Sequence, residues 1–196
     1  MQFALFTPSP GSVALWTALL VWGLPELVGL WRQRSRPGAI RRDRRSEAVL
    51  LGSLLLGLML AFAAMGVAQT RIPWQRPAFF WTGIILILTG VCVRWYAIRV
   101  LGASFTRDVA VRADQVVVDR GPYRLIRHPS YSGTLLTLLG VGLTTLNWAS
   151  LVLLLGCGLA GLLYRVRVEE QALLDYLGAP YAAYMRRTHR FIPYVI

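Results

Sequence analysis

The chain has 196 residues, of which 56% are hydrophobic and only 15% are charged, and its mean hydropathy is +0.52. A soluble domain carries about 25% charged residues, so this composition excludes a water-soluble globular protein. Seven Trp, eight Tyr and seven Phe exclude a disordered chain. The formal net charge of +12 comes from 21 basic residues, all of them Arg, against nine acidic ones. We therefore predict a single-domain integral membrane protein.

Three apolar segments occupy the first half of the chain, at residues 12–31, 48–68 and 78–98. Each has the roughly 20 apolar residues that a membrane-spanning helix needs. The first segment lacks the basic start of a cleaved signal peptide, so it is expected to stay as a helix. It contains Pro25 and Glu26, and we expect Glu26 to face the helix bundle.

The last apolar stretch, residues 130–164, contains 35 residues without a charged side chain. A single helix of this length would measure about 52 Å, whereas the hydrocarbon core of a bilayer is roughly 30 Å thick. The stretch is therefore predicted to form a helical hairpin that turns at residues 144–148. Together the segments predict an all-α, polytopic membrane helix bundle with about five transmembrane helices.

The arginines alternate between the two sides of the predicted bundle. Seven lie between the first two segments: Arg32, Arg34, Arg36, Arg41, Arg42, Arg44 and Arg45. Residues 99–127 contain six and the C-terminal segment five, whereas the opposite loops contain two and none. Because basic loops stay in the cytoplasm, the N-terminus is predicted outside and the C-terminus inside. Topology and contact with anionic lipids account for the net charge, so nucleic-acid binding is not expected.

Polar residues concentrate in two cytoplasmic segments, 99–131 and 164–196, which flank the hairpin and must therefore lie close together. The β-branched run at residues 115–119 is expected to be extended, and Gly121 and Pro122 indicate a turn. Pro129 suits the first turn of the following helix. In the second segment the helix is expected to continue to about Leu177 and to stop at Gly178.

Several side chains in these segments could carry chemistry. Arg165 and Glu169 lie four residues apart on one helix face with Glu170 beside them, and an ordinary helix-surface pair is the structural alternative. The residues at the entrance of the fourth helix, 127–131, lie where free N–H groups favour anionic ligands. Tyrosines are expected to anchor the helices at the membrane interface; they are Tyr123, Tyr131, Tyr181 and Tyr184. Two Cys and two His do not indicate a metal site.

Three motifs in order resemble the isoprenylcysteine carboxyl methyltransferase family: GPYRLIRHPSYSG at 121–133, RVRVEE at 165–170 and DYLGAPYAAYMRRTHRFIP at 175–193. The resemblance covers roughly residues 94–193, which we expect to form the catalytic core, while residues 1–93 match only in hydropathy. It implies a membrane methyltransferase with a cytosolic pocket for S-adenosyl-L-methionine. A lipophilic or prenylated substrate would enter this pocket from the bilayer.

Carried onto this chain, the resemblance implies roles for individual residues. Those expected to bind the cofactor are Gln115, Val116, Val117, Val118, Tyr123, His128, Pro129, Ser130, Tyr131 and Glu169. Arg165 is expected to bind a substrate carboxylate, and Arg127 and Glu170 are the other catalytic candidates. A carboxylate, with a pKa of about 4, is ionised at neutral pH and needs no general base. An amine acceptor would need one, and His128 or Glu170 would be the candidates.

Three other functions remain open from the sequence. An NADPH-dependent membrane reductase of the sterol-reductase type and a phospholipid N-methyltransferase have similar C-terminal regions. A non-catalytic lipid-binding protein with the same fold is the third alternative. The substrate-facing helices bear the least resemblance to the family, so the motifs do not identify the acceptor.

Overall fold

The computed structural model describes residues 9–32, 40–43, 45–102, 109–111 and 116–193. Helices dominate these ranges, which confirms the predicted fold class. The helices are α1 (Pro10–Arg32), α2 (Arg45–Ala64), α3 (Arg76–Leu101), α4 (Pro129–Thr144), α5 (Trp148–Leu177) and α6 (Ala179–Arg187), with short 3₁₀ turns η2 (Ala68–Thr70) and η4 (Gly121–Arg124).

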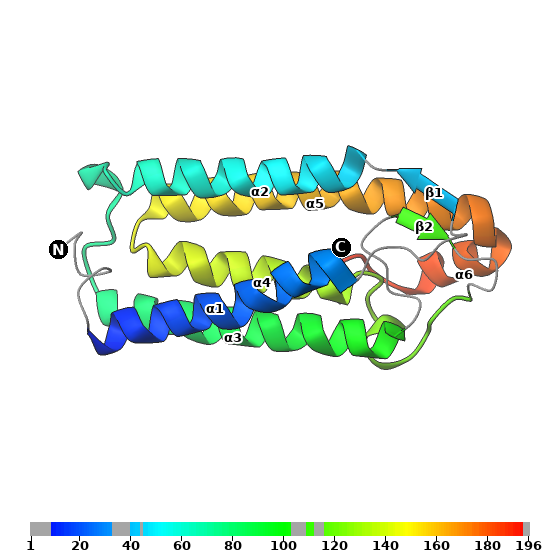
Figure 1. The fold of residues 1–196 in the computed structure, drawn as a ribbon, viewed down its shortest axis with the longest axis horizontal. Helices are drawn as coiled ribbons and strands as arrows, with labels where there is room; N and C mark the ends of the chain where they lie inside the picture. Colours follow the sequence, from blue (N-terminus) through cyan, green and yellow to red (C-terminus); the bar gives the residue numbers. More distant parts are fainter. Residues whose placement is uncertain (1–8, 33–39, 44, 103–108, 112–115, 194–196) are drawn as a thin grey trace.

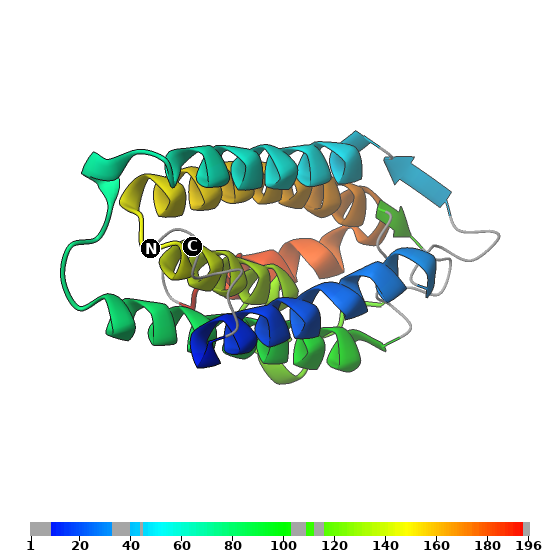
Figure 2. The same ribbon diagram turned by 60° about the vertical axis from the view of Figure 1, so that its left-hand side comes forward.

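The five long helices form one elongated bundle, in which α2 lies along α5 and α3 lies along α4 (Figures 1 and 2). Helix α1 packs on α3. Helix α6 lies at one end of the bundle, beside the C-terminal part of α5 (Figure 1). The bundle therefore consists of two antiparallel helix pairs, α2 with α5 and α3 with α4. The two pairs meet where α4 contacts α5, and α1 lies on the outside of α3.

Within the described residues, four helices are long and apolar enough to cross a membrane, namely α1, α2, α3 and α5. The predicted hairpin is present, but it divides its apolar stretch unequally. Helix α4 has only 16 residues, about 24 Å, whereas α5 has 30 residues, about 45 Å. Helix α4 is therefore shorter than the other four long helices, because α5 takes the larger share of the stretch and continues beyond its apolar part. As predicted, α5 ends at Leu177, and Gly178 follows with a φ of +61°.

Small residues let the helix backbones of each pair approach closely. A Cβ atom built on Gly90 of α3 would lie 2.5 Å from the carbonyl oxygen of Gly133 in α4. About two turns away on α3, a Cβ atom built on Gly83 would lie 2.7 Å from the carbonyl oxygen of Gly140. Such contacts are the usual means of helix association in a membrane, where the lipid supplies no hydrophobic driving force.

The hairpin turn is tied to the end of α2 by a fully buried asparagine. Asn147 caps α5 by accepting a hydrogen bond from the Ser150 backbone N–H at 3.0 Å. Its Nδ2 donates to the Ala64 carbonyl at 3.0 Å and to the Thr70 hydroxyl at 2.8 Å. These bonds satisfy polar groups at the closed end of the bundle and fix α5 relative to α2.

Helix α1 is held by an ion pair inside the bundle. The Arg94 guanidinium of α3 donates to both carboxylate oxygens of Glu26, with Nη2–Oε2 at 3.1 Å. Its Nη1 also reaches the Thr134 hydroxyl of α4 at 3.4 Å. The expectation that Glu26 faces the bundle is therefore confirmed, and a paired charge at this depth avoids the penalty of an isolated one.

A short antiparallel ribbon is the main departure from the predicted elements. It consists of β1 (Ile40–Asp43) and β2 (Val109–Val111), which pair near the α6 end of the molecule. The structure assigns no strand to residues 116–119, where the sequence predicted an extended run, and Gln115 lies outside the described residues. A strand needs a partner, and it is the earlier Val109–Val111 run that meets one.

We expect the substitution Gly90→Ala to lower the free energy of unfolding by about 1–3 kcal/mol, because its methyl group would overlap the α4 backbone. Gly52→Ala is the matched control, since no atom lies within 4 Å of a Cβ at this α2 position. Thermal unfolding of both variants in detergent measures the difference. Equal midpoints for the two variants would contradict this account of α3–α4 packing.

Candidate active site

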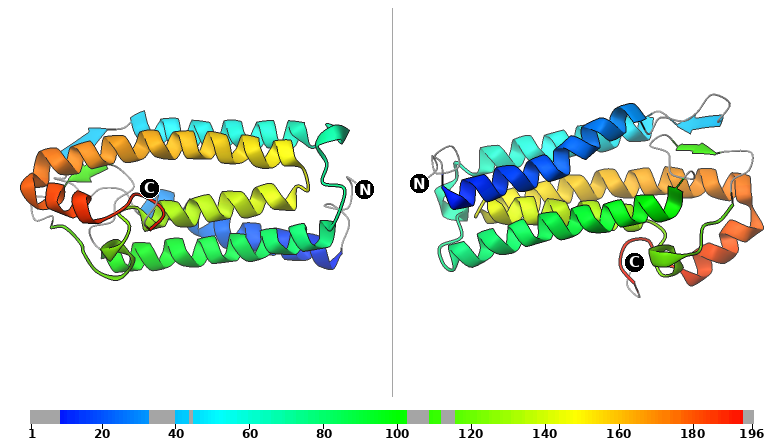
Figure 3. Two further views of the ribbon diagram at one scale, coloured as in Figure 1. Left: turned by 180° about the vertical axis from the view of Figure 1, so that it is seen from behind. Right: turned by 60° about the horizontal axis from the view of Figure 1, so that its bottom comes forward.

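The two polar segments meet at one end of the bundle, as the sequence predicted. The residues between η4 and the start of α4 lie beside the end of α5, and α6 with the C-terminal segment lies across them (Figures 1 and 3). Because α5 continues past its apolar part, Arg165, Glu169 and Glu170 lie in its C-terminal half, which leads to this end. Residues that are far apart in sequence therefore come together around the N-terminus of α4.

The C-terminal segment pairs with the chain that leads into α4. The Arg127 N–H donates to the His189 carbonyl at 2.7 Å, and the His128 N–H donates to the Arg190 carbonyl at 3.0 Å. The His189 N–H returns a bond to the Leu125 carbonyl at 3.0 Å. The hydroxyl of Ser132 adds a bond to the carbonyl of Phe191 at 2.6 Å. The segment after α6 thus forms one wall of the site.

Glu170 is the centre of a buried charge cluster. Its side chain is 5% exposed, and Oε1 accepts from Arg127 Nε at 2.8 Å and lies 3.3 Å from His128 Nε2. Arg190 donates to Oε2 from Nε at 3.0 Å and from Nη2 at 2.8 Å. Both carboxylate oxygens are therefore engaged by charged or polar donors from the two segments that flank α5.

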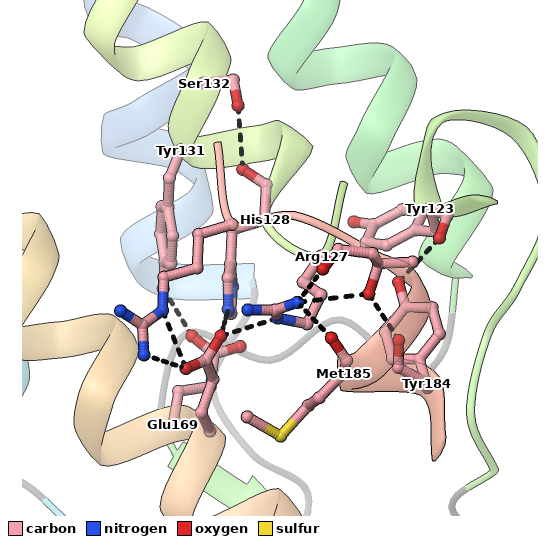
Figure 4. Close-up of polar contacts among 11 residues, drawn as sticks. Tyr123, Arg127, His128, Tyr131, Ser132, Glu169, Tyr184 and Met185 are labelled. Atoms are coloured by element: carbon pink, nitrogen blue, oxygen red, sulfur yellow. Dashed lines mark hydrogen bonds and ion pairs between the residues drawn. The ribbon is translucent and has the colours of Figure 1, made fainter. Parts of the chain in front are cut away.

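The Arg127 guanidinium also donates hydrogen bonds to several other groups of the protein. Its Nη1 donates to the Met185 carbonyl at 3.0 Å, to the Thr188 hydroxyl at 3.3 Å and, in a closer contact, to the Thr188 carbonyl (Figure 4). These bonds connect the entrance of α4 with the end of α6. The structure thus brings the two catalytic candidates Arg127 and Glu170 together, but their polar atoms face one another.

Glu169 differs from Glu170 in that only one of its carboxylate oxygens has a hydrogen-bond partner among the described residues. Its Oε2 accepts a hydrogen bond from the Tyr131 hydroxyl at 2.9 Å (Figure 4). In the described part of the chain we find no hydrogen bond to its Oε1, and the side chain is half-buried. The ring of His128 stacks on that of Tyr131, with centroids 5.5 Å apart and planes 16° apart. A half-buried carboxylate thus lies beside a pair of stacked rings.

Arg165 is joined to Glu169 through the same tyrosine. It is 4% exposed, and its Nε donates to the Tyr131 hydroxyl at 3.4 Å. Its Nη1 donates to the Ser46 hydroxyl of α2 at 2.6 Å. Ser46 was not predicted, because the first half of the chain offered only hydropathy and nothing in the sequence pairs positions 46 and 165.

The other predicted cofactor residues that the structure describes lie in the chain before α4 and in its first turn. Pro129 is buried in the first turn of α4, where its fixed φ suits the helix and its lack of an N–H is harmless. Ser130 is 7% exposed, and its hydroxyl makes no hydrogen bond to another described residue. The residues 116–118 lead into η4, with Val116 exposed and the next two valines half-buried.

Three tyrosines expected at the membrane interface are instead inside the protein. Tyr123, Tyr181 and Tyr184 are 5%, 4% and 4% exposed. The Tyr184 hydroxyl donates to the Tyr123 carbonyl at 2.7 Å and so attaches α6 to η4. Burial raises the pKa of Tyr123 and of Tyr184 above the ordinary value of about 10, so both phenols stay protonated donors. The interfacial interpretation is wrong for these residues, because all three side chains are buried inside the protein, where α6 is attached to η4.

Comparison with known proteins finds a similarity that covers part of the region that forms this site. The model of the isoprenylcysteine carboxyl methyltransferase (ICMT) family matches residues 83–175. The protein-S-isoprenylcysteine O-methyltransferase of Saccharomyces cerevisiae is 33% identical over 115 residues, which are 58% of this chain and 48% of the yeast protein. The uncharacterized protein YpbQ of Bacillus subtilis is 25% identical over 154 residues, 74% of this chain and 92% of that protein. The chain thus matches about half the length of the yeast relative.

A solved structure supports the same likeness. The eukaryotic intramembrane Ras methyltransferase ICMT superposes with a TM-score of 0.50 and 23% sequence identity, over 80% of this chain and 55% of that chain. Together with the apolar helices, this fold identifies an integral membrane protein with several spans. The resemblance predicted from the three motifs is confirmed, and residues 83–175 carry the family's sequence pattern.

We expect Glu170→Gln to lower the free energy of unfolding by about 3 kcal/mol, because it leaves the guanidinium groups of Arg127 and Arg190 without their shared counter-charge. Thermal unfolding in detergent measures this loss, and hydrogen exchange at the amides of residues 127, 128 and 189 should become faster. Asp175→Asn on the exposed side of the same helix is the control. Similar stability and exchange in both variants would contradict a central role for Glu170.

Proposed function

Because residues 83–175 match the ICMT family, we propose that this protein is an S-adenosyl-L-methionine-dependent carboxyl methyltransferase of the membrane. Its acceptor is the carboxylate of an isoprenoid or prenylcysteine-like lipid. The observation that carries the proposal is the convergence of Tyr131, from the first motif, with Arg165 and Glu169, from the second. Arg165 offers a cation for an anionic acceptor, and Glu169 offers an anion for a cationic methyl donor. The Tyr131 hydroxyl links the two side chains by hydrogen bonds.

The residues around Glu169 fit a methyl donor of this kind. When bound, S-adenosyl-L-methionine supplies an electrophilic methyl group on a positively charged sulfonium. The Oε1 of Glu169, which has no hydrogen bond to another described residue, and the hydroxyl of Ser130 would hold its polar end. The stacked rings of His128 and Tyr131 present π-faces that favour a nearby cation. Tyr123, Pro129 and residues 115–118 complete the cofactor-binding set that we propose.

Arg165 serves the acceptor in this proposal. Its guanidinium has five N–H donors in a planar fork, which matches a carboxylate. The Ser46 and Tyr131 hydroxyls fix its orientation, and burial at 4% exposure keeps water from competing. The acceptor carboxylate is already ionised, so no side chain has to remove a proton. Positioning of the two reactants supplies the rate enhancement, for which about 7–11 kcal/mol is attainable.

Arg127 and Glu170 have a positioning role in this scheme. Their mutual bonds, and those of Glu170 to His128 and Arg190, hold the C-terminal segment against the start of α4. His128 is thereby fixed under Tyr131, whose hydroxyl joins Arg165 to Glu169. We therefore propose that the pair shapes the pocket rather than touching the reacting atoms.

The proposed topology places this site at the cytoplasmic face. Helix α1 ends and α2 begins at the same end of the bundle as the site, and the arginine-rich residues 32–45 connect them. The positive-inside rule assigns this end to the cytoplasm, with the N-terminus outside and the C-terminus inside. A lipid acceptor would reach Arg165 from the bilayer, because this residue directly follows the uncharged stretch of α5.

The first test is cofactor affinity. We expect Glu169→Gln and His128→Ala each to raise the Kd for S-adenosyl-L-methionine about tenfold or more, since each removes a contact to a charged ligand. Isothermal titration of purified protein measures this, with Asp175→Asn as the control. NADPH should neither bind nor compete. An unchanged Kd in both site variants would remove the assignment, and competition by NADPH would favour a reductase.

The second test identifies the bond that is formed. Membranes containing the protein are incubated with methyl-labelled S-adenosyl-L-methionine, and the labelled lipid or protein fraction is treated with alkali. A carboxyl methyl ester releases its label as methanol, whereas an N-methyl lipid keeps it. We expect alkali-labile label that Arg165→Ala reduces at least a hundredfold. Alkali-stable label would instead support a phospholipid N-methyltransferase, and cofactor binding without labelling would support a non-catalytic protein.

A further inference from the structure

Ser46 lies outside the region that matches the family, yet its side chain reaches the proposed acceptor site. It is fully buried in the first turn of α2, and its Oγ accepts a hydrogen bond from Arg165 Nη1 at 2.6 Å. The contact joins residues 119 positions apart. Chain connectivity therefore contributes nothing to it, and the packing of α2 on α5 must bring the two residues together.

The register of α2 on α5 is set by small residues. A Cβ atom on Gly161 would lie 1.9 Å from the Ser53 hydroxyl, and one on Gly57 would lie 2.9 Å from Cys157 Cβ. The two helices are antiparallel, so each contact fixes the next one along the pair (Figure 2). Continuing from Ser53 opposite Gly161 for about two turns toward the site places Ser46 opposite residue 168, about one turn beyond Arg165, and the long Arg165 side chain spans this offset. The position of the serine thus follows from close backbone packing.

We infer that Ser46 is a positioning residue, which orients the Arg165 guanidinium toward the carboxylate of the methyl acceptor. This inference rests on the proposed function, because it takes Arg165 as the residue that binds the acceptor. Ser46 would thereby give the N-terminal half of the chain a role in acceptor binding. A guanidinium has several low-energy rotamers, and two hydroxyls hold this one: Tyr131 at Nε and Ser46 at Nη1. The Ser46 contact is the shorter of the two, at 2.6 Å against 3.4 Å.

The matched pair Ser46→Ala and Ser53→Ala tests this role. Both serines lie in α2 at the interface with α5, but the Ser53 hydroxyl donates within its own helix to the Leu50 carbonyl at 2.8 Å. In Ser46→Ala we expect kcat/KM for the acceptor to fall about tenfold, as for a lost hydrogen bond to a charged group. The Kd for S-adenosyl-L-methionine and the unfolding temperature should match those of Ser53→Ala. Equal kcat/KM in the two variants, or a loss that appears equally in cofactor affinity, would overturn the inference.

A chemical probe measures the same effect without turnover. Phenylglyoxal modifies arginine side chains that can leave their contacts, and mass spectrometry reports the modified fraction at Arg165. We expect Ser46→Ala to increase the modification rate of Arg165 several-fold, Ser53→Ala to leave it unchanged, and Ser46→Thr to restore the slow rate. An unchanged rate in Ser46→Ala would refute the positioning role. Absence of methyl transfer by the unaltered protein would count against the proposed function alone.

Discussion

One buried carboxylate holds the site end of this membrane protein together. Glu170 lies on the last long helix, and the groups that bond it come from the chain before α4 and from the segment after α6. Removing a carboxylate from water is unfavourable unless charged donors replace the lost hydration. Here the guanidinium groups of Arg127 and Arg190 do so, with the His128 ring beside them, and these groups can reach one carboxylate only when both flanking segments close over α5. The electrostatic requirement of Glu170 therefore dictates the tertiary arrangement of the site.

The neighbouring carboxylate has the opposite character, and this contrast separates structure from chemistry. Glu169 keeps one oxygen free of protein partners in the described residues and shares the other with Tyr131. Adjacent positions on a helix point in directions about 100° apart, so one residue can face the packed segments while the next faces the pocket. A single Glu-Glu dipeptide thus supplies both the anchor of the pocket and the group that we propose for the donor.

Much of this architecture could be predicted from the sequence, since uncharged stretches and stop signals are local properties. The hairpin turn and the end of α5 at Leu177 follow from such signals. The unequal lengths of α4 and α5, the buried tyrosines and the contact of Ser46 with Arg165 do not. Each depends on how segments distant in sequence pack: the Asn147 cap at the turn, α6 over η4, and glycines that set the register of α2. The motifs made Arg165 and Glu169 candidates, but they did not indicate which of the two glutamates keeps an oxygen without a partner among the described residues.

The shortness of α4 has a consequence for the depth of the site. Its far end is held at the level of Arg71, which forms a bridge with Asn147 and is expected to stay near the lipid headgroups. From that level a helix of 16 residues advances about 24 Å, less than the roughly 30 Å thickness of the hydrocarbon core. In the proposed topology, the pocket that we propose at the N-terminus of α4 is therefore recessed below the opposite surface of the bilayer. A lipid-anchored carboxylate would meet the donor without lifting its chain into water, so the free energy of extracting that chain would not enter the barrier.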